Sequence, residues 1–263
     1  SWRRSKMPEL PEVETLCRQL KKKICGREVL NNEVFDKKLV PVKRIRRGKV
    51  VDVSRRGKTI AIGLDDGRTI IIHLRMTGRL LWQTACDVPK YARWRLSLDN
   101  GEVFLIDPRR FATVKVSKEP ESRNNREIFG DFNLRMFVEL HGQRRTKIKS
   151  LLMDQNAISG IGNIYACEIL HRSGIHPARE AASLSKADWK RLLHQTRAVL
   201  GKAIKKRGTS ISDWRDLYGR KGENQNELTC YGKADSACPF CGEPIRRVKQ
   251  AGRGTYFCRT CQK

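Results

Sequence analysis

The sequence predicts an α+β protein in which a helix and a β domain are followed by a helical domain and a short cysteine-bearing tail. Three observations support this order. Apolar residues recur at helical spacing near the start, alternate at strand spacing over residues 40–116, and return to helical spacing beyond residue 127. Two C-x-x-C pairs stand near the end. A chain of 263 residues is long enough for two or three domains with separate cores.

The first helix is predicted between Pro8 and Gly26. Its apolar residues share helical spacing: Val13, Leu16, Cys17, Leu20 and Ile24. Pro11 suits the first turn of a helix, where its missing N–H costs little, and Gly26 suits the end. By this pattern alone, Pro8 and Glu9 mark the entry to the helix.

Short antiparallel strands are predicted next. Apolar residues alternate along two of them: Val51, Val53, Ile60, Ile62 and Leu64. The turn sequences at 65–67 and 99–101, Asp-Asp-Gly and Asp-Asn-Gly, separate neighbouring apolar runs. Such turns are typical of hairpins, so the pattern indicates a sandwich or a barrel.

A polar linker is predicted at 117–126, and helices follow it. Apolar faces occur over 148–152 and 164–170. The best-defined helix follows Ser185, which has Asp188 three residues on in a capping-box pattern, and it ends before Gly208.

The charge of the chain indicates a polyanionic partner. Lys and Arg number 55 against 28 Asp and Glu, giving a formal net charge of +27. Nucleic acid is the commonest partner of such a chain, and it is favoured here over an anionic membrane surface or a merely basic protein. No apolar run approaches the ~20 residues that span a bilayer. Charge alone leaves DNA and RNA, and enzyme and packaging protein, open.

The cysteine pairs predict one structural zinc ion. Cys238 and Cys241 are separated from Cys258 and Cys261 by sixteen residues, the spacing of a closed four-thiolate site. A tail this short needs such a metal to hold its fold. Between the pairs, a basic turn with Gly252 and Gly254 predicts a β-hairpin finger with Arg253 at its tip, although by spacing alone Arg253 is a solvated surface residue.

Several short motifs identify a family. They are Met7-Pro-Glu-Leu-Pro-Glu-Val-Glu-Thr15, Asp107-Pro-Arg-Arg-Phe111, Gly162-Asn-Ile-Tyr-Ala166, Gly174-Ile-His-Pro177, Gly208-Thr-Ser-Ile211, Cys230-Tyr-Gly-Lys233 and the finger. In this order they resemble the bacterial, zinc-finger type of formamidopyrimidine-DNA glycosylase from about Met7 to Lys263. The resemblance implies an N-terminal helix with an antiparallel β-sandwich, a helix–two-turn–helix domain and a four-cysteine zinc-finger hairpin. The expected boundaries are 8–126, 127–229 (including a loop over the flipped base) and 230–263.

The resemblance implies a base-excision repair enzyme. Such an enzyme excises 8-oxoguanine and formamidopyrimidines from duplex DNA and then cleaves the abasic site by β,δ-elimination. Its nucleophile would be the exposed amine of Pro8, with Glu9 as general acid and base. An α-amine has a typical pKa of about 8, so more of it is free base near neutrality than of a lysine. Because Pro8 is acylated in the printed chain, we expect residues 1–7 to be absent from the mature protein.

Further roles follow from the same resemblance. Lys58 matches an active-site lysine that assists the chemistry and holds a phosphate. Met76, Arg109 and Phe111 match the side chains that fill the gap left by an everted base, whereas pattern alone places Met76 and Phe111 in the core.

Other matches concern phosphate contacts. Lys149 and Asn163 match phosphate-binding positions, and Asn163 also suits a helix N-cap. Arg253 matches a finger arginine that reaches the phosphate near the lesion. The sequence departs from the family in two places. At Lys90-Tyr-Ala-Arg-Trp94, a histidine–phosphate contact of the family is either lost or replaced by a contact from Tyr91, and at 215–228, the loop over the flipped base, the sequence is unusual.

Two alternatives remain. One is an endonuclease VIII-like glycosylase for oxidised pyrimidines, and Leu10 argues against it because that branch resembles Pro-Glu-Gly-Pro. The other is an inactive protein that binds damaged DNA, and the presence of Pro8, Glu9 and Lys58 together argues against it. We expect a monomer that binds double-stranded DNA with oxidised bases or abasic sites, not a membrane, in the bacterial cytoplasm at the nucleoid.

Overall fold

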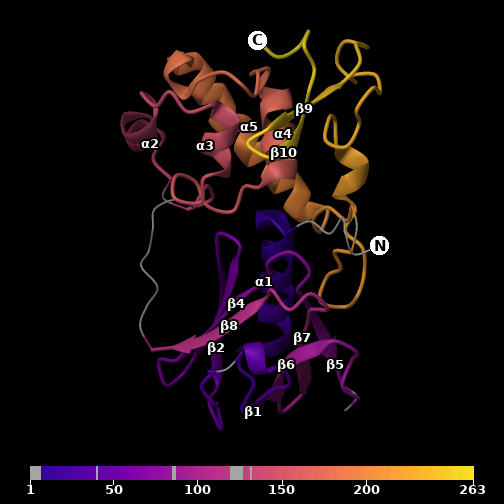
Figure 1. The fold of residues 1–263 in the computed structure, drawn as a ribbon. Helices are drawn as coiled ribbons and strands as arrows, with labels where there is room; N and C mark the ends of the chain where they lie inside the picture. Colours follow the sequence, from indigo (N-terminus) through magenta and orange to yellow (C-terminus); the bar gives the residue numbers. More distant parts are fainter. Residues whose placement is uncertain (1–6, 40, 85–86, 119–126, 131, 212) are drawn as a thin grey trace. The chain divides into compact units, whose positions relative to one another are not determined.

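The computed structural model describes residues 7–39, 41–84, 87–118, 127–130, 132–211 and 213–263. The segment ahead of Met7 and most of the predicted linker at 117–126 lie outside these ranges. The chain forms two compact units, Ser1–Arg123 with Ile204–Gln225, and Asn124–Ala203 with Asn226–Lys263. Figure 1 labels helices and strands of both units.

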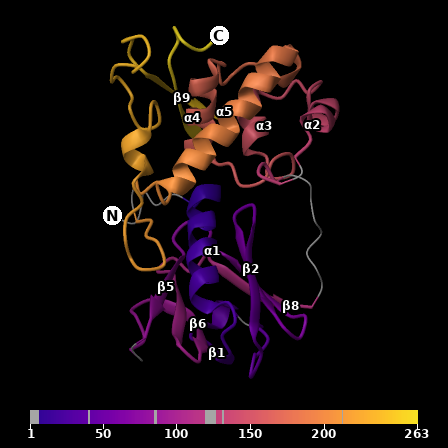
Figure 2. The ribbon, with the colours of Figure 1, turned by 180° about the vertical axis from the view of Figure 1, so that it is seen from behind.

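The first unit holds helix α1 (Leu10–Ile24) and antiparallel strands. The strands are β1 (Val29–Val34), β2 (Val50–Arg56), β3 (Thr59–Leu64), β4 (Thr69–His73), β5 (Arg79–Gln83), β6 (Ala92–Leu98), β7 (Gly101–Ile106) and β8 (Thr113–Ser117). They pair in one sheet of order β1-β6-β7-β5 and another of order β2-β3-β4-β8. A single core cluster takes buried residues from both sheets and from α1, and α1 runs along β2 (Figure 2). The predicted α+β fold with a sandwich is confirmed.

Local sequence explains where α1 begins and ends. The backbone N–H of Glu9 donates to Glu12 Oε2 at 2.8 Å, as part of a capping box at the N-terminus. Three lysines occupy the last turn, where positive charge favours the negative end of the helix dipole. Gly26 follows with a φ of +80°, a conformation that glycine adopts without strain.

The turn between β6 and β7 requires glycine for a steric reason. Gly101 has a φ of +142°, and a Cβ added there would lie 2.6 Å from the Trp82 ring and 2.8 Å from the Gln83 carbonyl. The turn at 99–101 therefore lets β7 approach β5 closely, and the two strands pair from Gln83 with Glu102 to Arg79 with Ile106.

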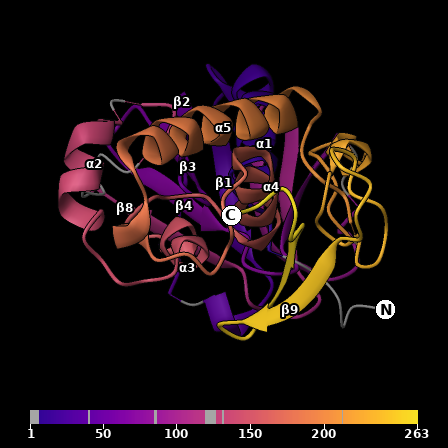
Figure 3. The ribbon, with the colours of Figure 1, turned by 90° about the horizontal axis from the view of Figure 1, so that it is seen from above.

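The second unit is helical with a terminal hairpin. Its elements are α2 (Leu134–His141), α3 (Ile148–Met153), α4 (Asn163–Ser173), the short 3-10 helix η3 (Ala181–Ser183), most of α5 (Lys186–Lys205), β9 (Arg246–Gln250) and β10 (Arg253–Phe257). The predicted capping box opens α5, because the Asp188 N–H donates to Ser185 Oγ and the Ser185 N–H donates to Asp188 Oδ2, both at 3.1 Å. Figure 3 shows the start of α5 beside α2, and Phe137 of α2 meets Trp189 of α5 edge to face at 5.9 Å.

Residues 204–225 were expected in the helical domain at 127–229. The structure instead groups them with the first unit. Asp216 is fully buried there and accepts from Gln19 Nε2 at 3.0 Å, while the Leu217 N–H donates to Gln19 Oε1 at 3.0 Å. The Trp82 N–H donates to the Leu217 carbonyl at 2.9 Å. The base of the loop predicted to cover a flipped base is therefore fixed to α1 and β5.

Candidate active site and nucleic-acid interface

Pro8 and Glu9 lie directly ahead of α1, and both are buried. Glu9 is only 4% exposed, and the capping box with Glu12 fixes its backbone. A carboxylate at this position lies at the positive end of the helix dipole. The fold thus places a proline and an acid side by side in a protected, electrostatically defined position.

Glu12 is a site residue that the sequence argument missed. It is buried, and its two oxygens accept from different segments, Oε2 from the Glu9 N–H at 2.8 Å and Oε1 from the Thr209 N–H at 2.7 Å. At Gly208, with φ +79°, an added Cβ would lie 2.8 Å from Glu12 Oε1. Glu12 therefore ties the start of α1 to the segment 208–209. The three-residue spacing of Glu9 and Glu12 at a helix start was the available signal.

Lys58 occupies the tight turn between β2 and β3, after Gly57 with a φ of +57°. It is half-buried. His73, at the end of β4, pairs in register with Thr59 next to it. Burial lowers the pKa of His73 to about 4, and the charges of Arg75 and Lys58 add to this effect. The ring is therefore neutral at pH 7 beside two cations, an environment suited to a phosphate.

The predicted gap-filling residues project from two loops of the first unit. Met76 is 37% exposed and belongs to the Met76 loop (residues 74–78), while Phe111 is 46% exposed and belongs to the Arg109 loop (residues 107–112). The Arg109 guanidinium lies 4.9 Å from the centre of the Phe111 ring. Pattern alone was therefore wrong to place Met76 and Phe111 in the core.

Both loops carry backbone strain next to these side chains. Arg75 has a φ of +54° and Arg110 a φ of +60°, conformations that cost a non-glycine residue about 1 kcal/mol or more. Tyr91 also has a positive φ, +67°, and its side chain is half exposed. The Tyr91 carbonyl accepts from the Asp107 N–H at 3.0 Å, so the structure joins Tyr91 to the first residue of the Arg109 loop.

Lys149 and Asn163 converge in the second unit. Lys149 is 2% exposed, and its ammonium donates to Asn163 Oδ1 at 2.6 Å and to Thr255 Oγ1 at 2.7 Å. Asn163 Nδ2 donates to the Gly254 carbonyl at 3.0 Å. Both residues thus hold the hairpin next to Arg253, which is exposed. The N-cap of α4 is Gly162, and Asn163 is its first helical residue, one position later than expected.

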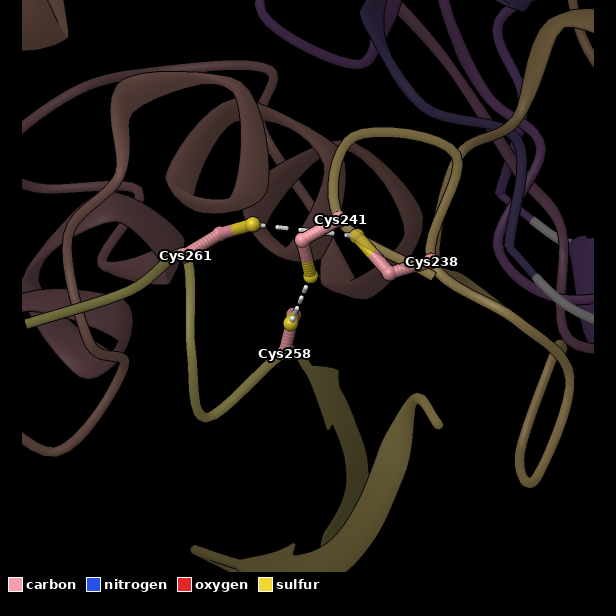
Figure 4. Close-up of side chains that lie close together, drawn as sticks. All are labelled: Cys238, Cys241, Cys258 and Cys261. Atoms are coloured by element: carbon pink, nitrogen blue, oxygen red, sulfur yellow. Dashed lines mark hydrogen bonds between the residues drawn. The ribbon is translucent and has the colours of Figure 1, made fainter. Parts of the chain in front are cut away.

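The cysteine thiols form a compact cluster (Figure 4). The Sγ atoms of Cys238, Cys241, Cys258 and Cys261 all lie within 4.8 Å of one another, with Cys241 and Cys258 at 3.5 Å and Cys238 and Cys261 at 3.8 Å. Four sulfurs at about 2.3 Å from a tetrahedral zinc ion stand about 3.8 Å apart. The cluster therefore fits one structural zinc ion.

A buried polar network supports this cluster. His171 of α4 lies 3.3 Å from Cys238 Sγ through Nε2 and 2.8 Å from Thr229 Oγ1 through Nδ1. Glu168 accepts from the backbone N–H groups of residues 229, 230 and 231 at 2.8–2.9 Å. Such outer contacts orient the ligands of a metal site. Helix α4 therefore fixes the start of the finger.

Each family domain has a counterpart in the chain. The N-terminal domain of formamidopyrimidine-DNA glycosylase matches residues 7–114, its helix–two-turn–helix domain matches 124–214, and a zinc finger found in this glycosylase and in isoleucyl-tRNA synthetase matches 236–263. Among the described residues, no helix has the length and apolar character needed to cross a membrane.

Similar proteins agree over almost the whole length. A formamidopyrimidine-DNA glycosylase of Desulforamulus reducens is 38% identical, covering 98% of this chain and 99% of its own. One from Salmonella arizonae is 37% identical, covering 98% and 100%.

Solved structures of the Lactococcus lactis enzyme show the same fold. A variant bound to DNA containing Fapy-dG has a TM-score of 0.87 at 33% identity, covering 97% of this chain and 100% of its own. The enzyme bound to DNA with an abasic site has a TM-score of 0.86 at 33% identity, covering 97% and 99%. The chain belongs to the formamidopyrimidine-DNA glycosylase family.

Proposed function

We propose that this protein excises oxidised purines, 8-oxoguanine and formamidopyrimidines, from duplex DNA and then cleaves the abasic strand. The observation that carries the proposal is the buried Pro8–Glu9 pair at the N-terminus of α1, braced by Glu12. Its relatives are named formamidopyrimidine-DNA glycosylase, and a solved structure of the similar Lactococcus lactis protein contains DNA with Fapy-dG.

The chemistry starts at Pro8. Once the residues ahead of it are removed, its imino nitrogen attacks C1′ of the damaged nucleotide, and the bond from C1′ to the base breaks. Glu9 supplies and accepts the protons on the sugar and the departing base. The C1′–O4′ bond then opens as O4′ takes a proton, which leaves Pro8 and C1′ joined as an iminium. The iminium carries positive charge without needing a proton and withdraws electrons, so loss of a proton from C2′ expels the 3′ phosphate, and loss of a proton from C4′ then expels the 5′ phosphate.

DNA binding would be divided between the two units. In the first, Lys58 and Tyr91 contact backbone phosphates, and Met76, Arg109 and Phe111 fill the gap left by the everted base. In the second, Asn163 and Arg253 bind phosphate. Lys149 lines a cavity of about 160 Å³ together with Arg253 and Gln250, where its charge adds to the attraction. A monomer acting on DNA in the bacterial cytoplasm fits this division.

Borohydride trapping tests the proposal and separates its alternatives. Protein beginning at Pro8 is incubated with duplexes containing 8-oxoguanine, thymine glycol or no lesion, and covalent adducts are counted. The proposal predicts efficient adducts with 8-oxoguanine. A preference for thymine glycol would support the endonuclease VIII-like alternative, and binding without any adduct would support a non-catalytic protein.

A further inference from the structure

An ion pair between Arg110 and Asp36 fixes the turn between Arg109 and Phe111. Arg110 lies between the two gap-filling residues, and its own side chain runs to Asp36, which follows β1. Arg110 Nε donates to Asp36 Oδ2 at 2.9 Å, and Arg110 Nη2 donates to Asp36 Oδ1. This is the two-point geometry in which an arginine and a carboxylate bind most strongly. Asp36 is 8% exposed and Arg110 47% exposed, so one end of the pair is anchored in the protein.

The anchor is itself fixed within the sandwich. Buried Arg93 of β6 donates from Nε to Asp36 Oδ2 at 2.6 Å and from Nη1 to the Ala112 carbonyl at 2.7 Å. The Lys38 N–H also donates to Asp36 Oδ1 at 3.0 Å. Asp36 therefore cannot move without disturbing β6 and the end of the Arg109 loop.

The two gap-filling loops are joined by Asp107. Its carboxylate accepts from the backbone N–H groups of Arg109 at 3.1 Å and of Phe111 and Ala112 at 2.7 Å. It also accepts from the Thr77 hydroxyl, in the Met76 loop. The Arg109 loop is thus held at its base by Asp107 and at its tip by Asp36.

The strained backbone explains what the ion pair does. With a φ of +60°, Arg110 reverses the chain so that the side chains on either side of it can stack, and Arg109 lies over Phe111. Without contacts that fix it, a non-glycine residue favours a negative φ over this conformation. We propose that Asp36 and Arg110 are positioning residues for base eversion, holding Arg109 and Phe111 in the stacked arrangement that enters the DNA. The inference rests on the proposed function.

The experiment compares two reactions of the same protein. Excision of 8-oxoguanine requires a stacked base to be displaced, whereas a preformed abasic site has no base to displace. Asp36→Asn and Arg110→Lys are predicted to slow single-turnover excision about 10-fold and to change cleavage at a preformed abasic site by less than about twofold. Arg110→Lys leaves the Asp36–Arg93 pair intact, so it folds, and both variants keep the charge at position 110.

Two controls isolate the mechanism. Glu33→Gln removes a partly buried ion pair between β1 and β6, remote from the Arg109 loop in sequence, in which Glu33 Oε2 accepts from Arg95 Nη2 at 2.5 Å. This variant is predicted to behave as the parent protein. In a Phe111→Ala background, Asp36→Asn is predicted to have no further effect on excision. A 2-aminopurine placed beside the lesion reports unstacking directly, and its fluorescence change should shrink in both positioning variants.

The outcomes are distinct. If Phe111→Ala impairs excision but Asp36→Asn and Arg110→Lys resemble Glu33→Gln, the positioning role is refuted and the proposed function stands. Equal losses in excision and abasic-site cleavage also refute it, because they indicate general damage to the fold. If the parent protein does not excise 8-oxoguanine at all, the proposed function fails and this inference fails with it.

Discussion

Buried carboxylates hold the functional segments of this protein in place. Glu12, Asp107, Asp216 and Glu168 each accept backbone N–H groups from a loop or a segment start. A hydrogen bond to a charged group contributes about 1.5–3 kcal/mol, more than a neutral one. These side chains act on the site through the backbone, so their residue type alone gave no sign of their role.

His73 gives a prediction for pH dependence. Its folded pKa of about 4 is below the ordinary 6.5, so between these values the unfolded chain binds more protons than the folded one. Stability should therefore fall as pH is lowered from 6.5 to 4. Allowing for solvent screening of a partly exposed ring, the loss assigned to His73 is about 1–2 kcal/mol.

Urea unfolding at about pH 7 and about pH 4.5 checks this. The difference in unfolding free energy between the two pH values should be smaller in His73→Gln than in the parent by about that amount. An equal difference in the two proteins would show that His73 does not stay neutral in the folded state.

At the scale of elements, the finger depends on its metal and on α4. Removing zinc with a chelator should abolish hydrogen-exchange protection in β9, β10 and residues 238–241. Without the metal that joins the four cysteines, so small a hairpin has too little core to stay folded. Affinity for lesion-containing duplex should fall about tenfold or more, since Arg253 loses its position. Protection in α1 and β2 should remain. Retained protection of β9 and β10 after measured zinc loss would contradict this account.

Sequence periodicity was sufficient for most elements and for the metal site. The helical spacing of Val13 to Ile24, the strand alternation around Ile60 and Ile62, and the cysteine spacing are local patterns, and the structure confirms each. The segment 204–225 was not predictable in this way. Its place depends on Asp216 reaching Gln19, 197 residues away in the chain, and no local pattern records that contact.

The loops that carry the proposed gap-filling residues were also beyond local pattern. Met76 and Phe111 look like core residues by pattern, and only the family resemblance indicated otherwise. Their exposure follows from positive φ at Arg75 and Arg110, which in turn depends on tertiary contacts such as the Asp36–Arg110 pair. Such contacts could not be derived from one sequence.

At the scale of the whole molecule, a net charge of +27 matches a polyanionic partner. The residues proposed for base chemistry belong to the first unit, and Asn163, Arg253 and the zinc cluster belong to the second. A protein that only bound DNA would not need the residues of the first unit proposed for base chemistry, and one that only performed the chemistry would not need the DNA-binding residues of the second. A protein that binds the duplex and also reacts with it accounts for both.

The most direct test of the account locates the covalent bond. Protein beginning at Pro8 is trapped with borohydride on 8-oxoguanine duplex, digested with protease and nuclease, and mapped by mass spectrometry; protein retaining residues 1–7 is treated in parallel. If Pro8 is the nucleophile, the sugar remnant will lie on the peptide that begins at Pro8, and the extended protein will form no adduct. An adduct on Lys58, or full activity with residues 1–7 still attached, would contradict that role.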